Sequence, residues 1–514
     1  MERKFNTKGI CVPEKHYMVD LTERVRLIEH EYIEPGEYFV INRARQYGKT
    51  TTLSLLANHL SDDYLLVKTS FEGKEEYFVS RSIMVGGLFR IFRETLKNKE
   101  PRLAAIFEPE VNEIYPMDDL ETRITELCKK SDKYVVLMID EIDKAADFDV
   151  FVTFLGKLRD MYIVREMDGK PAIKSVILAG VTDIKNLKSK IRDEKEGQSN
   201  SPWNIAADFN IDMSFSEEQI AGMLSEYEAD HHTGMDVQAL AYVLRDQTSG
   251  YPFLVSAICK HIDEVSHDWT ITGVHAAIAI MIYRSTTLFD SIVVKLNNNP
   301  EFRAMIEAML LQGARIIYTK TDSRISTGLM FGILKDNGAE VGVSNKIFET
   351  VIYNHLASEQ RTDFTDTDVR LSTLYLHDGR LDIEALLDGF ATHAKAVSNK
   401  KIKMNETLWK YRFLDHLRGA VNGTGHFSVE SETRDGKRID VKVYYKLDEF
   451  IVELKIWHGE KKERDAYDQL ANYMMGESKN RGYLVSFCGL RTPPERGKWI
   501  SYNGVRIYEV VVEY

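Results

Sequence analysis

A glycine, a lysine and a threonine lie side by side at Gly48, Lys49 and Thr50, after a β-branched and aromatic run at 37–41 and before an amphipathic run that starts at 51. A strand, a loop and a helix in this order place backbone amides and the positive end of a helix dipole around phosphate oxygens. In such a loop the lysine reaches the β and γ phosphates and the hydroxyl ligates Mg²⁺. We therefore predict a nucleoside triphosphate site. Its expected ligands are Arg45, Gln46, Tyr47, Gly48, Lys49, Thr50 and Thr51.

The predicted phosphate loop departs from the glycine-rich pattern at Arg43, where glycine is expected. An arginine there restricts the backbone and adds a bulky cation. Because Gly-Lys-Thr alone is common by chance, the prediction needs a second motif.

Two acids that follow a buried strand supply this second motif. The apolar run at 133–139 ends in Asp140 and Glu141. At the carboxyl end of a strand, the first acid can hold Mg²⁺ through its water shell and the second can orient or deprotonate the attacking water. We assign Asp140 to the metal and Glu141 to catalysis. A third apolar run at 175–181 ends at Thr182, which is a candidate sensor of the γ-phosphate, although a plain strand end explains it equally well.

A second group of charged residues lies in the last quarter of the chain. Asp440 belongs to a predicted strand at 436–443, and Glu453 and Lys455 belong to the next one at 450–456. Side chains two apart on a strand share one face. Two carboxylates can bind a hard divalent cation, and a lysine can position or activate water for attack on a phosphodiester. The set predicts a metal-dependent nuclease, with a solvated charge ladder as the alternative.

The composition sets the scale of the molecule. With 514 residues, 44% hydrophobic and 28% charged, the chain should fold into about three soluble domains. No apolar run approaches the roughly 18 residues that cross a bilayer, and the first residues lack an apolar signal-peptide core. We expect a cytoplasmic protein with no membrane partner. The cysteines have no metal-ligand spacing and should be reduced thiols: Cys11, Cys128, Cys259 and Cys488.

The middle of the chain, 266–370, is predicted to be a helical lid with a winged-helix hairpin, followed by a polar linker at 358–368. A winged helix can bind DNA, but we expect it to pack against the nucleotide domain. The predicted domains are therefore 1–265 for the nucleotide, 266–370 for lid and linker, and 371–514 for the nuclease.

From about residue 5 to 260 the chain resembles the AAA-ATPase-like family of bacterial proteins. The matching stretches are FNTKG at 5–9, YFVINRARQYGKT at 38–50, IDEID at 139–143 and SPWNIA at 201–206. An arginine in the phosphate loop is habitual in that family, so the resemblance implies that Arg43 is compatible with a working site. It also implies a P-loop NTPase fold with an AAA-like parallel sheet, and ATP as the ligand.

Residues from about 375 to 514 resemble the PD-(D/E)XK nuclease superfamily, whose motif is filled by Asp440, Glu453 and Lys455. The resemblance implies a restriction-endonuclease-like α/β domain. It also implies that Glu406, on a preceding helix, is a further metal ligand. Gln469 and Tyr473 are similar to the Q-x-x-x-Y element of RecB-type nucleases, and residues four apart share one helix face, so both can face the catalytic site.

Together these features predict a multidomain α/β protein that binds and hydrolyses ATP and cuts nucleic acid with Mg²⁺ or Mn²⁺. The resemblance alone favours DNA over RNA. The net charge of −12 argues against a generally basic surface, although one cluster could follow a phosphate backbone: Lys400, Lys401, Lys403, Lys410 and Arg412. The open alternative is a nucleotide-gated interaction or nucleic-acid-binding protein with a catalytically silent nuclease-like domain. A second copy of the chain is a further candidate partner, forming a homo-oligomer.

Overall fold

The computed structural model describes most of the chain in fourteen segments. They are 3–109, 114–146, 148–181, 203–284, 286–312, 314–359, 375–377, 380–398, 406–421, 425–432, 438–446, 448–456, 460–488 and 498–513. Two compact units emerge: one holds Met1–Ser214 with Met330–Gly332, and the other holds Phe215–Leu329 with Ile333–Tyr514. Each unit is described by itself.

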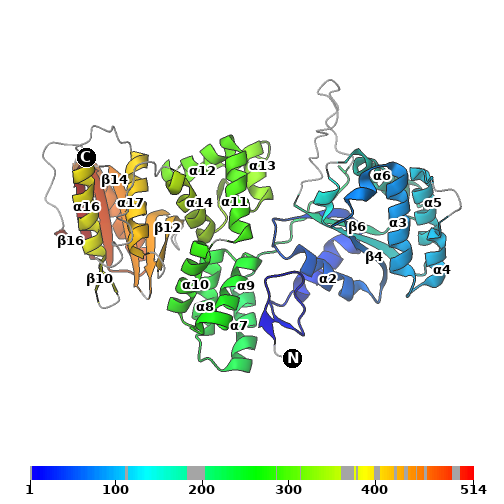
Figure 1. Cartoon of the computed structure of the whole chain (residues 1–514), viewed down its shortest axis with the longest axis horizontal. Helices are drawn as coiled ribbons and strands as arrows, with labels where there is room; N and C mark the ends of the chain where they lie inside the picture. The colour runs from blue at the N-terminus through cyan, green and yellow to red at the C-terminus, as the bar shows by residue number, and fades with distance from the viewer. Residues whose placement is uncertain are drawn as a thin grey trace, which may run out of the picture. The chain divides into compact units, whose positions relative to one another are not determined.

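The first unit is built on a parallel sheet (Figure 1). Its spatial order is β3 (Tyr38–Asn42), β6 (Ser175–Gly180), β5 (Tyr134–Asp140) and β4 (Tyr64–Ser70). All three pairings are parallel, so the carboxyl ends of the strands share one edge. The strand that carries the predicted acids is thus separated by one strand from the strand that leads into the phosphate loop. A smaller parallel pair joins β1 (Lys4–Phe5) and β2 (His16–Tyr17).

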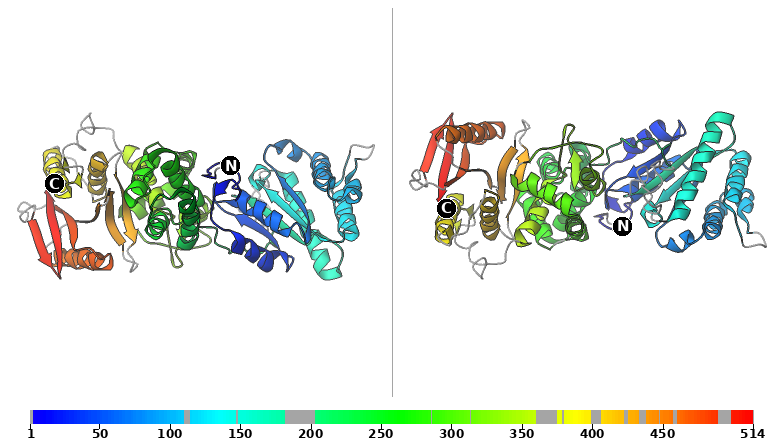
Figure 2. Two further views of the ribbon diagram at one scale, coloured as in Figure 1. Left: turned by 90° about the horizontal axis from the view of Figure 1, so that it is seen from below. Right: turned by 90° about the horizontal axis from the view of Figure 1, so that it is seen from above.

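Apolar side chains alternate between the two faces of this sheet because neighbouring residues of a strand point to opposite sides. One face packs against α3 (Arg81–Leu96), α5 (Met117–Lys130) and α6 (Asp149–Asp168). The other packs against α1 (Thr22–Ile28), α2 (Lys49–Leu60) and the segment 209–213. Figure 2 shows helices on both sides of the sheet. Short elements connect these layers: η1 (Glu29–Ile33), η2 (Glu75–Phe78), α4 (Pro101–Ala104), η3 (Ala105–Phe107) and η4 (Ile142–Lys144).

The second unit begins with helices. They are α7 (Glu217–His231), α8 (Val237–Thr248), α9 (Pro252–His261), η6 (Ile262–Ser266), α10 (Ile271–Arg284), α11 (Thr287–Asn298), α12 (Pro300–Gln312), α13 (Ser323–Met330) and α14 (Lys346–Glu359). A small antiparallel sheet in the order β7 (Ile316–Ile317), β9 (Glu340–Val343), β8 (Leu334–Asp336) supplies the expected hairpin. Among the described residues no single helix is long and apolar enough to cross a membrane, and one bent pair, α10 with α11, reaches that length only together.

A mixed sheet of six strands completes the second unit (Figure 1). Its order is β12 (Gly425–Glu432), β13 (Arg438–Tyr445), β14 (Asp448–Ile456), β15 (Arg481–Cys488), β17 (Val505–Glu513) and β16 (Lys498–Tyr502). On one face of the sheet, the ring of Phe487 packs against Phe390 of α16 (Ile383–Ser398) and Trp409 of α17 (Glu406–Val421). Both helices therefore cover this face. α18 (Glu460–Gly476) covers the other face with Leu470 and Met474. A short hairpin pairs β10 (Leu376–His377) with β11 (Arg380–Leu381).

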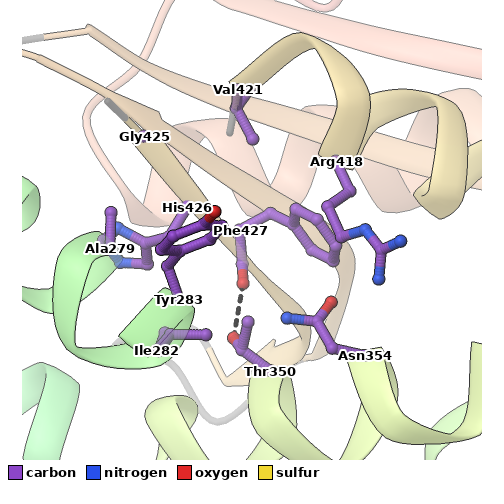
Figure 3. A pocket seen from close by; sticks show the side chains of 10 residues that line it. All are labelled: Ala279, Ile282, Tyr283, Thr350, Asn354, Arg418, Val421, Gly425, His426 and Phe427. Atoms are coloured by element: carbon purple, nitrogen blue, oxygen red, sulfur yellow. Dashed lines mark hydrogen bonds between the residues drawn. The ribbon is translucent and has the colours of Figure 1, made fainter. Parts of the chain in front are cut away.

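The compact units and the predicted domains divide the chain differently. Helices α7 to α9 fall inside the predicted nucleotide domain, yet they share a unit with the C-terminal sheet. Within the second unit, α10 and α14 pack on β12 (Figure 3). The expected packing of the helical middle against the nucleotide domain stays a prediction. Most of the predicted linker lies outside the described residues.

Candidate nucleotide and metal sites

The phosphate loop turns through two left-handed residues, Gln46 at φ 58° and Gly48 at φ 80°. A Cβ on Gly48 would meet nothing within 4 Å, so its backbone angle, and not crowding, calls for glycine there. The Lys49 side chain, only 7% exposed, donates from Nζ to the carbonyl oxygens of Arg43 and Ala44 at 2.9 Å each. Burial lowers the pKa of Lys49, against the opposing effect of Glu141, Asp143 and Asp140. The amine is thus held in the loop among acidic groups.

The hydroxyl and the acid predicted to share a metal ion lie together. Oγ1 of Thr50 donates to Oδ2 of Asp140 at 2.7 Å, and Oδ1 of Asp140 accepts from the Glu141 amide at 2.9 Å. A hydroxyl and a carboxylate are oxygen ligands that suit Mg²⁺. These two residues therefore fit a metal ion bound with the nucleotide.

Arg43 does not obstruct the loop. It is not among the residues with positive φ, and its guanidinium lies 5.2 Å from the centre of the Phe209 ring. It donates to the carbonyl oxygens of Phe209 at 3.2 Å and Ile211 at 2.9 Å. The arginine therefore holds the segment 209–213 beside the loop through hydrogen bonds. The local sequence did not predict this structural role.

Glu141 follows the strand in a left-handed conformation, with φ 53°. It is partly exposed. Its pKa is raised, mainly by burial and to a smaller extent by the charge of Asp140. A base with a raised pKa suits proton abstraction from water near neutral pH. Asp143, missed as a site residue, accepts from the Val181 amide at 3.0 and 2.8 Å through its two oxygens. A Cβ on Gly180 would lie 2.6 Å from Ile142, so glycine permits this close approach.

The other predicted nucleotide ligands have varied positions. Arg45 and Gln46 are exposed on the loop, and Tyr47 is half-buried. Thr51 is buried, and its hydroxyl accepts from the backbone amide of Cys11 at 3.2 Å, so the N-terminal segment reaches the start of α2. Thr182 lies outside the described residues.

The predicted nuclease acids lie opposite each other on neighbouring strands. Val441 pairs with Val452 in the antiparallel ladder, so Asp440 and Glu453 occupy the next opposed positions. There Oδ2 of Asp440 accepts from the Leu454 amide at 2.8 Å. The carboxylate of Asp440 thus takes the place of a backbone acceptor where the ladder ends, which fixes it beside Glu453.

Glu453 is fully buried, and its Oε2 has no hydrogen-bond partner within the described parts of the chain. The amine of Lys455 lies 2.8 Å from Oε1 of Glu453. Burial raises the pKa of Glu453 to about 8, with a further rise from Asp440 and a partial offset from Lys455. The raised pKa of Glu453 decides the protonation of this ion pair, because the Glu453 carboxylate is fully buried whereas the Lys455 side chain is 37% exposed. An enclosed carboxylate with one unsatisfied oxygen is a costly arrangement that a bound cation would relieve.

Gln469 and Tyr473 lie on α18, which covers the Glu453 face of the sheet. Ile451, two residues before Glu453, packs with Leu470 of α18. Nε2 of Gln469 donates to the Tyr473 hydroxyl. The pKa of Tyr473 is raised to about 12, mainly by burial and secondly by the charge of Glu453. The structure therefore places Tyr473 within the electrostatic influence of the acids, and Gln469 is bonded to its hydroxyl.

Two further predictions fall largely outside the described side chains. Glu406 is the first residue of α17, which lies on the opposite face from α18, and its side chain is not described. Among the described residues no group of three or more histidines, cysteines and acids could hold a metal ion. Of the basic cluster, only Arg412 has a described side chain, and it lies 5.7 Å from the Trp409 ring centre.

A second buried carboxylate near the site escaped the sequence analysis. Glu509 on β17 is 1% exposed, and it accepts from the hydroxyls of Tyr467 at 2.6 Å and Ser486 at 3.2 Å. Ser486 pairs with Lys455 in the sheet register. Glu509 thus has hydrogen bonds at both oxygens, whereas Oε2 of Glu453 has none among the described residues. Its partners lie 42 and 23 residues away, so no local pattern marks it.

Comparisons with solved structures give distant similarities over about two thirds of this chain. A Walker-type ATPase of Pyrococcus abyssi is 12% identical, with a TM-score of 0.45, over 68% of this chain and 99% of its own. Cdc6p of Pyrobaculum aerophilum is 15% identical, with a TM-score of 0.32, over 66% and 95%. The ORC2 protein of Aeropyrum pernix in its ADP form is 12% identical, with a TM-score of 0.37, over 70% and 98%. No protein-family model and no curated protein matches the chain. The geometry of the two sites is therefore the basis for assigning a function to the chain.

Proposed function

We propose that the chain binds and hydrolyses ATP and that its C-terminal sheet is a metal-dependent nuclease acting on DNA. The observation that carries the nuclease proposal is Glu453, a fully buried carboxylate opposite Asp440. Its Oε1 lies 2.8 Å from the Lys455 amine, and its Oε2 has no partner among the described residues. Charge at such a position is unfavourable unless a cation accompanies it.

In this proposal Asp440 and Glu453 would hold Mg²⁺ or Mn²⁺. The bound metal would stabilise negative charge on the leaving oxygen and make the attacking water a stronger nucleophile. Lys455 positions the attacking water, because its amine lies beside Glu453 and still reaches solvent. Tyr473 lines the site from α18, and its hydroxyl accepts a hydrogen bond from Gln469. Glu406, the first residue of α17, remains a proposed additional ligand only because it fits the helical acid of the resemblance.

In the first unit, Lys49 binds the β and γ phosphates of ATP, and Thr50 and Asp140 hold the accompanying Mg²⁺. The support is the direct contact of Thr50 with Asp140 at 2.7 Å and the placement of Lys49 in the loop. Glu141 takes the proton of the attacking water, with Thr182 as the proposed sensor. We propose that ATP controls cutting, in a cytoplasmic protein that can assemble as a homo-oligomer.

One observation favours the alternative of a silent nuclease-like domain. The described acids at the site number two, Asp440 and Glu453, and Lys455 already neutralises one of them. A site with so few acids can persist as a nucleic-acid-binding or interaction surface that ATP gates.

Incubation of the full chain with linear and circular DNA and Mg²⁺, with and without ATP, separates the two functions. We expect wild type to cut and Asp440→Ala to be inactive under every condition. Glu509→Gln serves as a control, because it changes a buried carboxylate of the same sheet that is not a proposed ligand. Equal behaviour of wild type and Asp440→Ala on DNA and on RNA would leave only the alternative.

A further inference from the structure

The end of β6 lies between the two motifs of the nucleotide site and is bonded to both. On one side β6 pairs with β3, and the carbonyl oxygen of Gly180 accepts from the Arg43 amide at 3.2 Å. On the other side the Asp143 carboxylate accepts from the Val181 amide at 3.0 and 2.8 Å. Arg43 begins the phosphate loop, and Asp143 belongs to η4, the turn that follows β5. The end of β6 therefore bridges the phosphate loop and the acidic turn.

A side chain is needed at this bridge because the backbone ladder between β5 and β6 ends early. The last pair of that ladder is Ile139 with Leu178. Beyond it the chain of β5 turns away, with Glu141 in a left-handed conformation. Val181 lies past the end of the ladder, and the Asp143 side chain takes the place of a strand carbonyl as the acceptor for its amide.

The contact of Asp143 with β6 also depends on glycine at position 180. A Cβ there would lie 2.6 Å from Cγ1 of Ile142 and 3.1 and 3.2 Å from the carboxylate oxygens of Asp143. Gly180 is not among the glycines with positive φ, so the close approach, and not the backbone angle, requires it. Val181 is only 8% exposed. Because a buried amide without an acceptor costs about 1–3 kcal/mol, this contact is favoured over an open turn.

The turn that Asp143 anchors carries the proposed base of ATP hydrolysis. Glu141 immediately precedes η4, and its carbonyl oxygen accepts from the Lys144 amide at 3.2 Å. A short hydrogen-bonded turn thus connects Glu141 to the anchor. On the other strand, Val181 is followed in the sequence by Thr182, the proposed sensor. Displacing a catalytic group by about 1 Å can slow a reaction on the order of a hundredfold, so an anchor at this point matters for the rate.

We propose that Asp143 is a positioning residue for ATP hydrolysis, which holds Glu141 and the end of β6 in place relative to the phosphate loop. The inference rests on the proposed hydrolysis of ATP at this site. Asp143 acts through Glu141 and the Val181 backbone, whereas Lys49 and the loop bind the phosphates. Loss of the Asp143 contact should therefore slow hydrolysis and leave nucleotide binding nearly unchanged.

Steady-state ATP hydrolysis and fluorescent-nucleotide titration of the full chain test the proposal. We expect Asp143→Ala to lower kcat at least about tenfold and to change the Kd of the nucleotide less than about threefold. Asparagine keeps a side-chain oxygen that can accept from the Val181 amide, so Asp143→Asn should keep kcat within about threefold of wild type. This rescue by the conservative variant separates positioning through a hydrogen bond from an effect of the Asp143 charge.

Gly180→Ala is a second variant that leaves Asp143 itself unchanged. Its methyl group should displace the carboxylate and lower kcat as Asp143→Ala does. The double variant should lose no more than the slower single variant, because both changes break one contact. Asp149→Ala is the matched control, since Asp149 is an exposed acid at the start of α6, and it should keep the wild-type kcat. A calorimetric melting profile shows that each variant remains folded.

Three results overturn this inference alone while wild type hydrolyses ATP. They are a wild-type kcat in Asp143→Ala or in Gly180→Ala, an equal loss of kcat in Asp143→Ala and Asp143→Asn, and a loss of kcat matched by an equal loss of nucleotide affinity. Absence of hydrolysis in wild type itself overturns the proposed ATPase and this inference with it.

Discussion

Replacing Glu453 by glutamine should change how the stability of the second unit depends on pH. Burial raises the Glu453 pKa from 4.5 to about 8. Between these values the folded state holds more protons than the unfolded state, so the free energy of unfolding falls as pH rises, by about 1.4 kcal/mol per pH unit. From about pH 5 to about pH 8 this loss amounts to about 4 kcal/mol in wild type without metal, and glutamine removes it.

Differential scanning calorimetry in a chelator, at both ends of this pH range, measures the effect. We expect the stability of Glu453→Gln relative to wild type to be greater at the higher pH by about 4 kcal/mol, or at least about 5 °C in the thermal midpoint. The cost of burying an amide does not depend on pH, so it cancels in this comparison. Saturating Mn²⁺ should stabilise wild type by about 3 kcal/mol at a hundredfold excess over Kd, and should not stabilise the variant.

Glu509→Gln is the matched control for this experiment. Its carboxylate is as buried as that of Glu453, but it already accepts hydrogen bonds from Tyr467 and Ser486. We expect this variant to be less stable than wild type and to keep the response to Mn²⁺. If Glu453→Gln differed from wild type equally at both pH values, or if both variants behaved alike, the reasoning about Glu453 would be refuted.

The remaining predictions concern other parts of the molecule. Lys49→Ala should weaken ATP binding at least about tenfold, whereas Glu141→Gln should bind ATP normally and hydrolyse it more slowly; equal loss of binding in a fluorescent-nucleotide titration would contradict the role of Glu141. Arg43→Gly should lower the free energy of unfolding by about 1–3 kcal/mol, measured by urea denaturation, because it removes the donor to Phe209 and Ile211. His275 is buried, and burial lowers its pKa from 6.5 to about 4. Its folded pKa is depressed, so stability should fall by about 3 kcal/mol as pH drops from 6.5 to about 4, and the His275→Phe variant should lack that loss in urea melts.

The parts of each site that depend on local spacing were predictable from the sequence. Apolar runs located β3, β5 and β14, and the two-residue period of a strand put Glu453 and Lys455 on one face. The four-residue period of a helix likewise put Gln469 beside Tyr473. These features follow from backbone geometry, which a single segment determines.

Interactions between distant segments were not predictable in this way. Arg43 looked like a defect of the phosphate loop because its acceptors lie 166 and 168 residues away. Lys346 pairs with Asp246 at 2.6 Å across 100 residues, and His426 meets Gln247 across 179. The first contact joins two helices of the middle region, α14 and α8, and the second joins α8 to the C-terminal sheet. No periodicity within any of these segments predicts them. The unexpected grouping of the second unit has this origin.

Crystallographic anomalous scattering from Mn²⁺ tests the central claim most directly, with an ATP analogue bound to the full-length protein. We predict a manganese peak within coordination distance, about 2–2.5 Å, of carboxylate oxygens from both Asp440 and Glu453, with the Lys455 amine on the same side of the sheet. The peak should vanish in Asp440→Ala and remain in Glu509→Gln. An empty site at saturating Mn²⁺, or a peak held by other residues while Glu453 stays enclosed by protein, would contradict the account.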